Sequence, residues 1–245
     1  MTTQSLDALT GALLQAARDA GAEAADALAV DGTSLSIDIR AGKLEQAERA
    51  EGIEIGLRVL IGGRQACVSA SDISARTIAV LAERAVAMAR EAPVDRHAGL
   101  ADPAQLARGW EIASYELCAP APDPGAAALE SDARVAEAAA MAKAGIRQVE
   151  ASAAYSRRRV HLAASNGFAG GYERSSRSVS AVAFTGEGTA MERDWAGESR
   201  IFQADLPSAA EVGALAATRA LERAGAVKPR TGSFPVLFDE RVAAS

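Results

Sequence analysis

The chain has two histidines, His97 and His161, and histidine is the residue type that most often acts as a metal ligand or general base. His97 lies in a loop-like stretch, whereas His161 follows three arginines on a predicted strand. No His-Glu-x-x-His sequence occurs, so no helix places two imidazoles one turn apart. We interpret both as surface histidines, and we expect no hydrolytic zinc site with three protein ligands within these residues.

Sequence motifs for nucleophilic catalysis and nucleotide binding are also missing. There is no Gly-x-Ser-x-Gly nucleophile elbow. The glycine-rich pieces Gly62-Gly63 and Gly186-Glu187-Gly188 fit neither a phosphate-binding loop nor a dinucleotide fingerprint, and we interpret them as hairpin turns. The sequence therefore assigns no catalytic, cofactor-binding or metal-binding residue, and we expect no cofactor in this chain.

Three carboxylates, Glu192, Asp194 and Glu198, surround Trp195 in the second half of the chain. Arginines at positions 193 and 200 are close enough in sequence to balance their charge. We interpret this group as the solvated face of a strand.

Arginines are concentrated at Arg157-Arg158-Arg159, with Arg174 and Arg177 expected on a neighbouring strand. Alternation along a strand turns Arg157 and Arg159 to one face and Arg158 to the other. Such a patch could bind a peptide carboxylate or an acidic partner surface. The alternative is an ordinary exposed sheet edge, where arginine blunts aggregation.

Two cysteines, Cys67 and Cys118, are too few for a disulfide framework or a cysteine-rich zinc site. We expect Cys67 to be a small buried side chain on a strand, while Cys118 could be exposed in a proline-rich connection. A reducing compartment fits both. The N-terminus lacks the basic and unbroken apolar regions of a signal peptide, and no stretch approaches the ~18 apolar residues of a membrane span. We therefore predict a cytoplasmic protein without a membrane partner.

Length and composition are those of a globular protein. The 245 residues are 49% hydrophobic and 24% charged, which makes disorder along most of the chain improbable. The 26 basic and 32 acidic residues give a net charge of −6. This charge argues against nucleic acid as a partner, because nothing would offset the repulsion from phosphate.

Hydrophobic periodicity predicts the same plan twice. The first half has a helix over 5–20, strands over 34–40, 44–49, 53–61 and 64–70, and a helix that is capped by Ser74 and runs to about Arg90. The second has a helix over 126–144, five strands between 147 and 195, and a final helix opened by a Ser208–Glu211 capping box. Helix stops and turns recur at an offset of about 124 residues. The predicted fold is α+β: two successive helix–antiparallel sheet–helix units that arose by duplication.

Proline positions suggest where the units are divided. Five of the eight prolines lie at 93, 103, 120, 122 and 124. We predict an N-terminal α+β domain over 1–95, a proline-rich linker over 96–125 and a central α+β domain over 126–227. Residues 228–245 would begin a truncated C-terminal domain with a strand over 231–238, so we expect an N-terminal piece of a longer protein.

Several segments, taken in order, resemble the TldD/PmbA family. Those similar to its N-terminal domain are residues 31–40, 42–45, 52–59, 62–64 and 69–72. Residues 98–103 (Ala-Gly-Leu-Ala-Asp-Pro) resemble its PmbA/TldE-like branch, and 165–167 (Ser-Asn-Gly) a turn of its central domain. Residues 228–232 and 235–239 resemble the entry to its C-terminal domain. The resemblance covers nearly the whole chain.

This resemblance implies a function that the residues alone do not. The family is associated with cytoplasmic metallopeptidase-type proteins that process or degrade unfolded peptides. TldD-like members carry a zinc motif in their C-terminal half, and PmbA-like members lack it and pair with a TldD-like subunit. We therefore expect a scaffold that shapes a substrate chamber and a subunit interface. The interface would form either with a TldD-like partner, which would hold the zinc, or by self-association. The alternative is a non-catalytic binding or regulatory protein, such as a modulator of DNA gyrase or an antitoxin-type protein.

Overall fold

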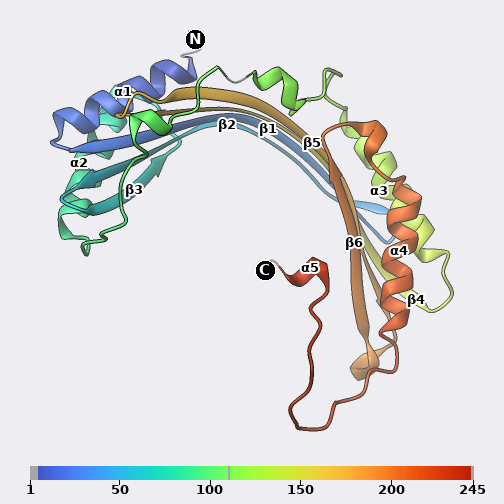
Figure 1. Cartoon of the computed structure of the whole chain (residues 1–245). Coiled ribbons are helices and arrows are strands. Elements are labelled where there is room, and N and C mark those ends of the chain that lie inside the picture. Colours follow the sequence, from blue (N-terminus) through green and yellow to red (C-terminus); the bar gives the residue numbers. More distant parts are fainter. Residues whose placement is uncertain (1–4, 110, 244–245) are drawn as a thin grey trace.

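The protein, represented by a computed structural model that describes residues 5–109 and 111–243, is built on one curved antiparallel sheet (Figure 1). The strand order is β3-β2-β1-β4-β5-β6, and every neighbouring pair is antiparallel. The strands are β1 (Ala24–Arg40), β2 (Lys43–Ile61), β3 (Arg64–Ala70), β4 (Ile146–Ala164), β5 (Ala169–Thr185) and β6 (Glu192–Arg200). Four of the six have 17 or 19 residues, which is long for a globular protein.

Helices flank the strands of each half. They are α1 (Leu6–Asp19), α2 (Ala75–Glu91), α3 (Ala126–Met141), α4 (Ala209–Glu222) and the short α5 (Glu240–Ala243). The predicted caps are confirmed. Ser74 accepts the Thr77 amide at the start of α2, and Ser208 and Glu211 form a complete capping box at the start of α4. The described residues also form 3₁₀ turns at Pro103–Gln105, Ile112–Tyr115, Gly188–Ala190 and Gln203–Asp205.

Both halves have the order helix, three strands, helix, and the predicted α+β class is confirmed. Glycines 21 and 145, which follow the first helix of each half, both have φ of +96°. Only glycine takes this conformation without strain, so the helix stops correspond in backbone geometry as well as in sequence. The two-residue turns Ala41-Gly42 and Gly62-Gly63 also have positive φ at both positions, as tight hairpins require.

The structure differs from the prediction in how the strands are joined. Strands β1 and β4 pair without interruption from Asp26–Ala164 to Arg40–Glu150, so the two halves share one sheet. The predicted strands 44–49 and 53–61 are one strand, β2, and the predicted pairs of strands over 147–164 and 168–186 are β4 and β5. In the sequence, Gly52 and the arginines near 158 and 177 suggest that the strands are interrupted there. The ladder continues through them because β1 pairs with β2 through Gly52, and β4 pairs with β5 through Arg158 and Arg177.

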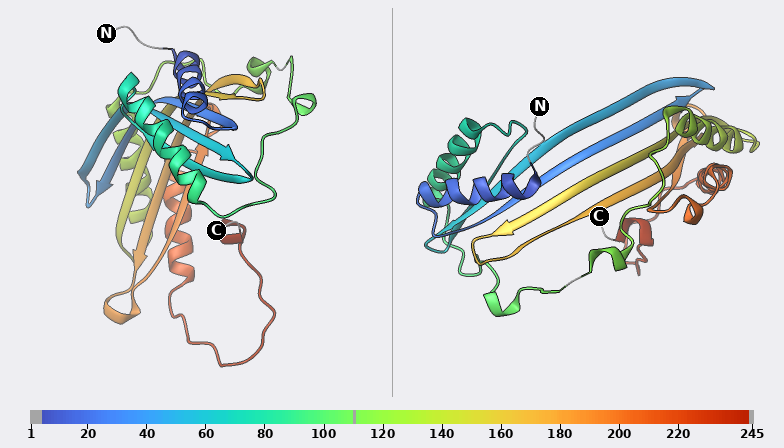
Figure 2. Two further views of the ribbon diagram at one scale, coloured as in Figure 1. Left: turned by 90° about the vertical axis from the view of Figure 1, so that its left-hand side faces the viewer. Right: turned by 90° about the horizontal axis from the view of Figure 1, so that it is seen from above.

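Both helix pairs lie on the same, convex face of this sheet (Figure 2). Odd-numbered residues of β1 enter two separate hydrophobic clusters. Ala25, Ala27 and Ala29 pack with α1 and α2, whereas Ile37 and Ile39 pack with α3 and α4. Because side chains alternate along a strand, one face of β1 supplies both cores.

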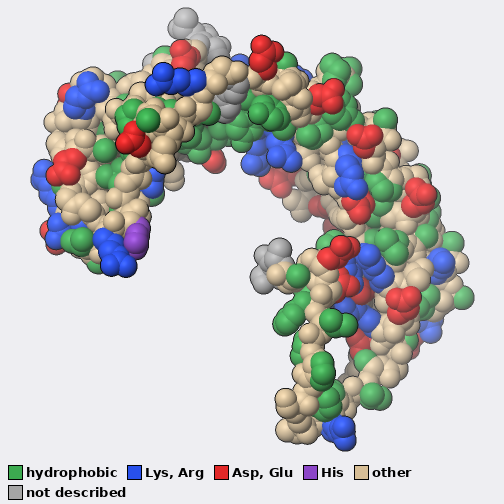
Figure 3. Space-filling model, viewed as in Figure 1, with side chains coloured by type: hydrophobic (Ala, Val, Ile, Leu, Met, Phe, Trp, Pro, Cys, Tyr) green, Lys and Arg blue, Asp and Glu red, His purple; other side chains and the backbone are tan. Residues whose placement is uncertain are grey.

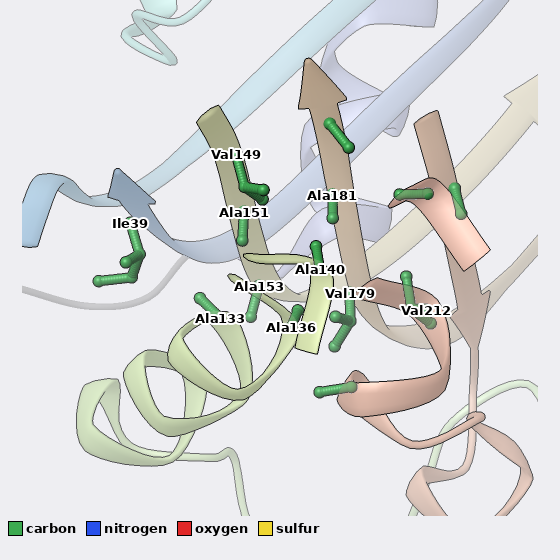
Figure 4. Close-up of a cluster of buried hydrophobic side chains, with 14 of the residues drawn as sticks. Ile39, Ala133, Ala136, Ala140, Val149, Ala151, Ala153, Val179, Ala181 and Val212 are labelled. Atoms are coloured by element: carbon green, nitrogen blue, oxygen red, sulfur yellow. The ribbon is translucent and has the colours of Figure 1, made fainter. Parts of the chain in front are cut away.

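Small residues bring α3 and α4 close to the sheet and to each other. The cluster in Figure 4 is mostly alanine and valine, including Ala133, Ala136 and Ala140 of α3. A Cβ at Gly213 of α4 would lie 2.0 Å from the carbonyl oxygen of Ala136. Residue 213 must therefore be glycine for the two helix backbones to touch.

A buried carboxylate fixes the tip of the β1–β2 hairpin. Glu137 of α3 is only 6% exposed, and its Oε1 and Oε2 accept the Gly42 amide at 2.9 and 3.1 Å. Arg134, one turn earlier on α3, donates to the Gly42 carbonyl at 2.7 Å. Side chains of one helix thus satisfy both backbone groups of Gly42. These contacts hold the β1–β2 turn, where β2 begins, in place.

Asp194 corrects our interpretation of the carboxylates near Trp195 as a solvated strand face, whereas Glu198 pairs with Arg200 at an exposed position, as expected. Asp194 is only 7% exposed, and its partners are Arg223 of α4 at 2.7 Å and Arg241 of α5 at 3.0 Å, not Arg193 or Arg200. Burial alone would raise the pKa of Asp194, but the hydrogen bonds from Arg223, the Trp195 amide and Arg241 together lower it. Asp194 therefore joins the sheet edge to two C-terminal segments that are distant in sequence.

The predicted strand over 231–238 is not formed. These residues run as an irregular segment that leads into α5, because they have no neighbouring strand with which to pair. Within this segment Leu237 is 99% exposed and Phe238 is 74% exposed. The division into domains by residue number remains a prediction.

The Glu137 contact yields a first prediction. Glu137→Ala should lower the free energy of unfolding by about 1–3 kcal/mol, because the Gly42 amide loses a charged acceptor that joins the turn to α3. It should also speed amide hydrogen exchange at the β1–β2 turn. Chemical denaturation and hydrogen exchange measure both effects. Glu83→Ala, at an exposed position of α2, serves as the control and should change stability by less than about 0.5 kcal/mol. Equal effects of the two substitutions would contradict this role for Glu137.

Asp194 yields a prediction with a pH dependence. A carboxyl whose pKa is lowered by folding contributes stability at any pH above its ordinary pKa, and this contribution is lost as the pH falls from there through the lower pKa of the folded protein. Asp194→Asn should cost about 1–3 kcal/mol at neutral pH, and the deficit should shrink in acid. Denaturant titrations of both proteins at neutral and acidic pH give the comparison. Glu198→Gln, which removes an exposed ion pair with Arg200, is the control and should have little effect at either pH. A deficit that does not change with pH would refute the assignment.

Candidate functional site

The face of the sheet opposite the helices is concave, and Figure 3 shows the hollow that it encloses. Side chains alternate along each strand, so the residues between the buried ones point into this hollow. We call the surface that they form the concave face. Three large side chains lie partly exposed on it: Leu28 of β1, Tyr172 of β5 and Trp195 of β6. Small polar residues fill much of the space between them, including Ser34, Ser36, Ser152, Ser156, Ser176, Ser178, Ser180 and Ser199. Such a surface can accept a polypeptide without specifying its sequence.

One edge of the sheet has no neighbouring strand over much of its length. Strand β3 pairs with β2 only from Ile55 to Ile61, so the described structure places no strand beside residues 43–54 of β2. Residues 43–52 are exposed without exception. We call residues 43–54 the free edge.

Hairpin geometry shows which backbone groups of the free edge are available. Residues flanking a two-residue turn form a hydrogen-bonded pair, so Ile61 directs its amide and carbonyl toward Arg64 of β3. Every second residue along β2 directs its amide and carbonyl to the same side as Ile61. The amides and carbonyls of Ala47, Arg49, Glu51 and Ile53 therefore point away from β1, toward the side without a strand.

The corresponding edge on the other half of the sheet is partly covered. Residues 169–176 of β5 lie beyond the reach of β6, and the linker crosses them. The Ser175 amide donates to the Leu117 carbonyl at 3.1 Å, and the Ala119 amide donates to the Ser175 hydroxyl at 2.9 Å. Asp123 of the linker accepts a hydrogen bond from Tyr155 at 2.7 Å. Burial and this hydrogen bond raise the pKa of Tyr155 to about 12.

The five arginines do not form one patch, because the sheet divides them between its faces. Arg157 pairs with Glu173 and Asp123, Arg159 with Asp31, and Arg177 with Asp132, all on the convex side. Arg158 and Arg174 lie on the concave face, directly opposite each other on β4 and β5. The predicted alternation of Arg157 and Arg159 against Arg158 is confirmed. The position of Arg174 requires the strand register, which the sequence does not provide.

The two histidines have different surroundings, because His97 is exposed and His161 is half-buried. Nδ1 of His161 lies 2.9 Å from the hydroxyl of Thr10, which donates to the Asp7 carbonyl and is left to accept from the ring. His97 is exposed and accepts a hydrogen bond from Arg96. Among residues 5–109 and 111–243, no group of three or more His, Cys, Asp or Glu side chains is arranged to hold a metal ion.

Cys67 is exposed, so the expectation that it is buried is wrong. Its neighbours Ala66 and Val68 point toward the helices, and alternation turns Cys67 to the concave face. Cys118 is partly exposed in the linker. In the described part of the chain, no helix is both long and apolar enough to cross a membrane.

Comparison with known proteins agrees with this architecture. The domain family described as PmbA/TldA metallopeptidase domain 1 matches residues 25–89, and the PmbA/TldA metallopeptidase central domain matches residues 119–224. The chain is 31% identical to the metalloprotease PmbA of Escherichia coli O157:H7 over 212 residues, which are 86% of this chain and 47% of that protein. It thus spans about half the length of this curated relative.

Solved structures share the fold. A proposed modulator of DNA gyrase from Bacteroides thetaiotaomicron superposes with a TM-score of 0.73 at 23% identity, over 95% of this chain and 53% of that one. TldE from Thermococcus kodakarensis superposes with a TM-score of 0.64 at 14% identity, over 88% of this chain and 47% of that one. The two domain matches, in the order in which the two halves of the sheet are built, show that this chain belongs to the PmbA/TldD metallopeptidase family.

Proposed function

We propose that this chain is the polypeptide-holding and subunit-contacting part of a PmbA/TldE-like subunit, which acts with a TldD-like partner to process or degrade unfolded peptides. The observation that carries the proposal is the free edge of β2 beside an open concave face. Family membership supports the reaction class, and peptide hydrolysis, zinc in the partner subunit and a cytoplasmic location come from the family resemblance.

The free edge supports recognition through the peptide backbone. An extended chain added beside β2 would hydrogen-bond with the outward amides and carbonyls of residues 47, 49, 51 and 53. Main-chain hydrogen bonds do not depend on side-chain identity, so this mode suits substrates of varied sequence. It also selects unfolded peptides, because folded proteins seldom present an unpaired strand.

Rigidity of this edge favours binding. Glu137 and Arg134 hold the hairpin turn at one end of the free edge, and β3 pairs with β2 directly beyond the other end. A strand held at both ends loses little conformational freedom when a peptide pairs with it. The charged residues Lys43, Glu45, Glu48, Arg49, Glu51 and Glu54 keep the edge from pairing with other copies of the chain.

A proline at the free edge tests this mode. Glu51→Pro removes an outward amide and leaves the ladder with β1 intact, so binding of an unfolded peptide should weaken by roughly 5- to 30-fold, corresponding to about 1–2 kcal/mol. Calorimetric titration with an extended peptide measures the affinity. Glu51→Gln removes the same charge but keeps the amide, so it should bind as the wild type does. If Glu51→Pro binds the peptide normally, the free edge does not hold it.

The division of labour between subunits has its own test. Chelation should abolish peptide hydrolysis by the reconstituted pair of this protein and a TldD-like subunit, and zinc should restore it. This protein alone should neither bind zinc stoichiometrically nor cleave unfolded peptides, as metal analysis and a peptide assay would record. Stoichiometric zinc together with cleavage by this protein alone would overturn the assignment. Co-purification shows whether the two subunits associate.

A further inference from the structure

A hollow of about 380 Å³ lies on the concave face directly beside the free edge. A polypeptide strand added at the free edge would place every second side chain over this hollow, because partners in a ladder have their side chains on the same face. The hollow is lined by three alternate residues of the free edge and by their partners on β1, which are Ala50, Gly52, Glu54, Ser34, Gly32 and Val30.

Two glycines clear a path through this hollow to an arginine of β4. Gly52 of β2 lies opposite Gly32 of β1, and Gly32 lies opposite Arg158 of β4. A Cβ at Gly52 would meet no heavy atom within 4 Å, whereas a Cβ at Gly32 would lie 3.2 Å from Cγ of Arg158. The Arg158 side chain therefore runs across Gly32 and lines the hollow. Along this row, no side chain stands between Arg158 and the free edge.

The guanidinium group of Arg158 is available to a ligand. Within the described residues it has no hydrogen bond and no ion pair, whereas Arg157 and Arg159 on either side both pair with carboxylates. A guanidinium group carries five N–H donors, and their hydrogen bonds to a carboxylate are stronger than those between neutral groups. The hollow thus contains a positive charge with free donors.

We propose that Arg158 is a specificity-determining residue, which binds an acidic side chain of the polypeptide held at the free edge. The acidic residue would lie opposite Gly52, so that its side chain extends over the two glycines toward the guanidinium group. Three strand spacings of about 4.8 Å, or about 14 Å in all, separate the peptide backbone from that of Arg158. Only long side chains that reach toward each other can bridge this distance, so glutamate fits better than the shorter aspartate.

Glu54 limits the ligand to a single carboxylate. It lines the same hollow and lies one row from Gly52, opposite Val30. Like charges at facing positions of a sheet are destabilising, so Glu54 opposes a second acidic residue in the peptide. The net charge of −6 also disfavours a polyanion such as nucleic acid. The hollow therefore suits a peptide with one glutamate at this position rather than an acidic tract.

The site adds selectivity to the proposed function, on which it rests. The free edge would hold any extended backbone, and Arg158 would favour peptides that place a glutamate opposite Gly52. The two contributions are separable, because one depends on backbone amides and the other on side-chain charge.

The experiment uses the purified protein and three capped peptides of one length, which are uncharged except for a central Glu, Asp or Gln. Calorimetry at low ionic strength gives the affinities, and NMR follows the Nε–H signal of Arg158, assigned from Arg158→Gln. The matched control is Arg174→Gln. Arg174 also lies on the concave face, but it lines a different hollow beside Ser176 and Ser199, so this variant removes the same charge from outside the site.

We expect the Glu peptide to bind roughly tenfold tighter than the Gln peptide and to shift the Arg158 signal, with a smaller gain for the Asp peptide. Arg158→Gln should remove this preference without lowering the melting temperature, because Arg158 has no partner to lose. Arg174→Gln should retain most of the preference.

Two further variants test the path and the limit set by Glu54. Gly52→Val fills the path between the free edge and Arg158, and the extended backbone at Gly52 accepts valine without strain. This variant should lose the preference for Glu but still bind the Gln peptide, since the outward amides of β2 are unchanged. Glu54→Gln should increase the preference, because it removes the opposing charge.

Three results would overturn the site. If the wild type binds all three peptides equally, Arg158 does not select the ligand, while the polypeptide-holding role survives. If the preference for Glu persists in Arg158→Gln, or falls equally in Arg174→Gln, the charge is recognised elsewhere or only through the overall field of the concave face. If no peptide binds at all, both this site and the proposed function fail.

Discussion

The architecture depends on the ladder between β1 and β4. These strands come from different halves of the chain and pair without interruption from Asp26–Ala164 to Arg40–Glu150. Without this ladder the molecule would have two small three-stranded sheets, each with an additional bare edge. With it, the two hydrophobic clusters are fixed on one face, and the opposite face becomes a single concave surface. The concave face runs across this ladder, because Gly32 of β1 and Arg158 of β4 are partners in it.

Local features of the fold could be predicted from the sequence, and contacts between distant residues could not. The caps at Ser74 and Ser208 and the turn at Gly62-Gly63 depend on residues within a few positions of each other, and all were predicted correctly. The pairing of β1 with β4 joins segments about 120 residues apart, and no local pattern encodes it. Asp194 illustrates the same limit, because its buried state depends on Arg223 and Arg241 from segments that fold back onto β6.

The placement of the arginines on the two faces of the sheet could be predicted only in part from the sequence. Strand alternation is enough to separate Arg158 from Arg157 and Arg159. The register between β4 and β5 is needed to place Arg174 opposite Arg158, and the register with β1 is needed to place Gly32 beside it. Cys67 shows the opposite error: its residue type suggests burial, but its position in β3 turns it to the concave face. Residue type alone therefore misassigns a side chain wherever strand parity decides which face it occupies.

The separation of the two helix pairs has a mechanical consequence. Helices α1 and α2 pack against one end of the sheet and α3 and α4 against the other, whereas long strands, with the linker along β5, span the interval between them (Figure 1). Densely packed helix–sheet layers resist small deformations, so bending of the sheet is concentrated in the strands between the two helix pairs. The opening of the arch is thus set by coiling of the central strands. A partner that contacted both ends of the sheet could change the distance between them only by bending these strands and their backbone hydrogen bonds.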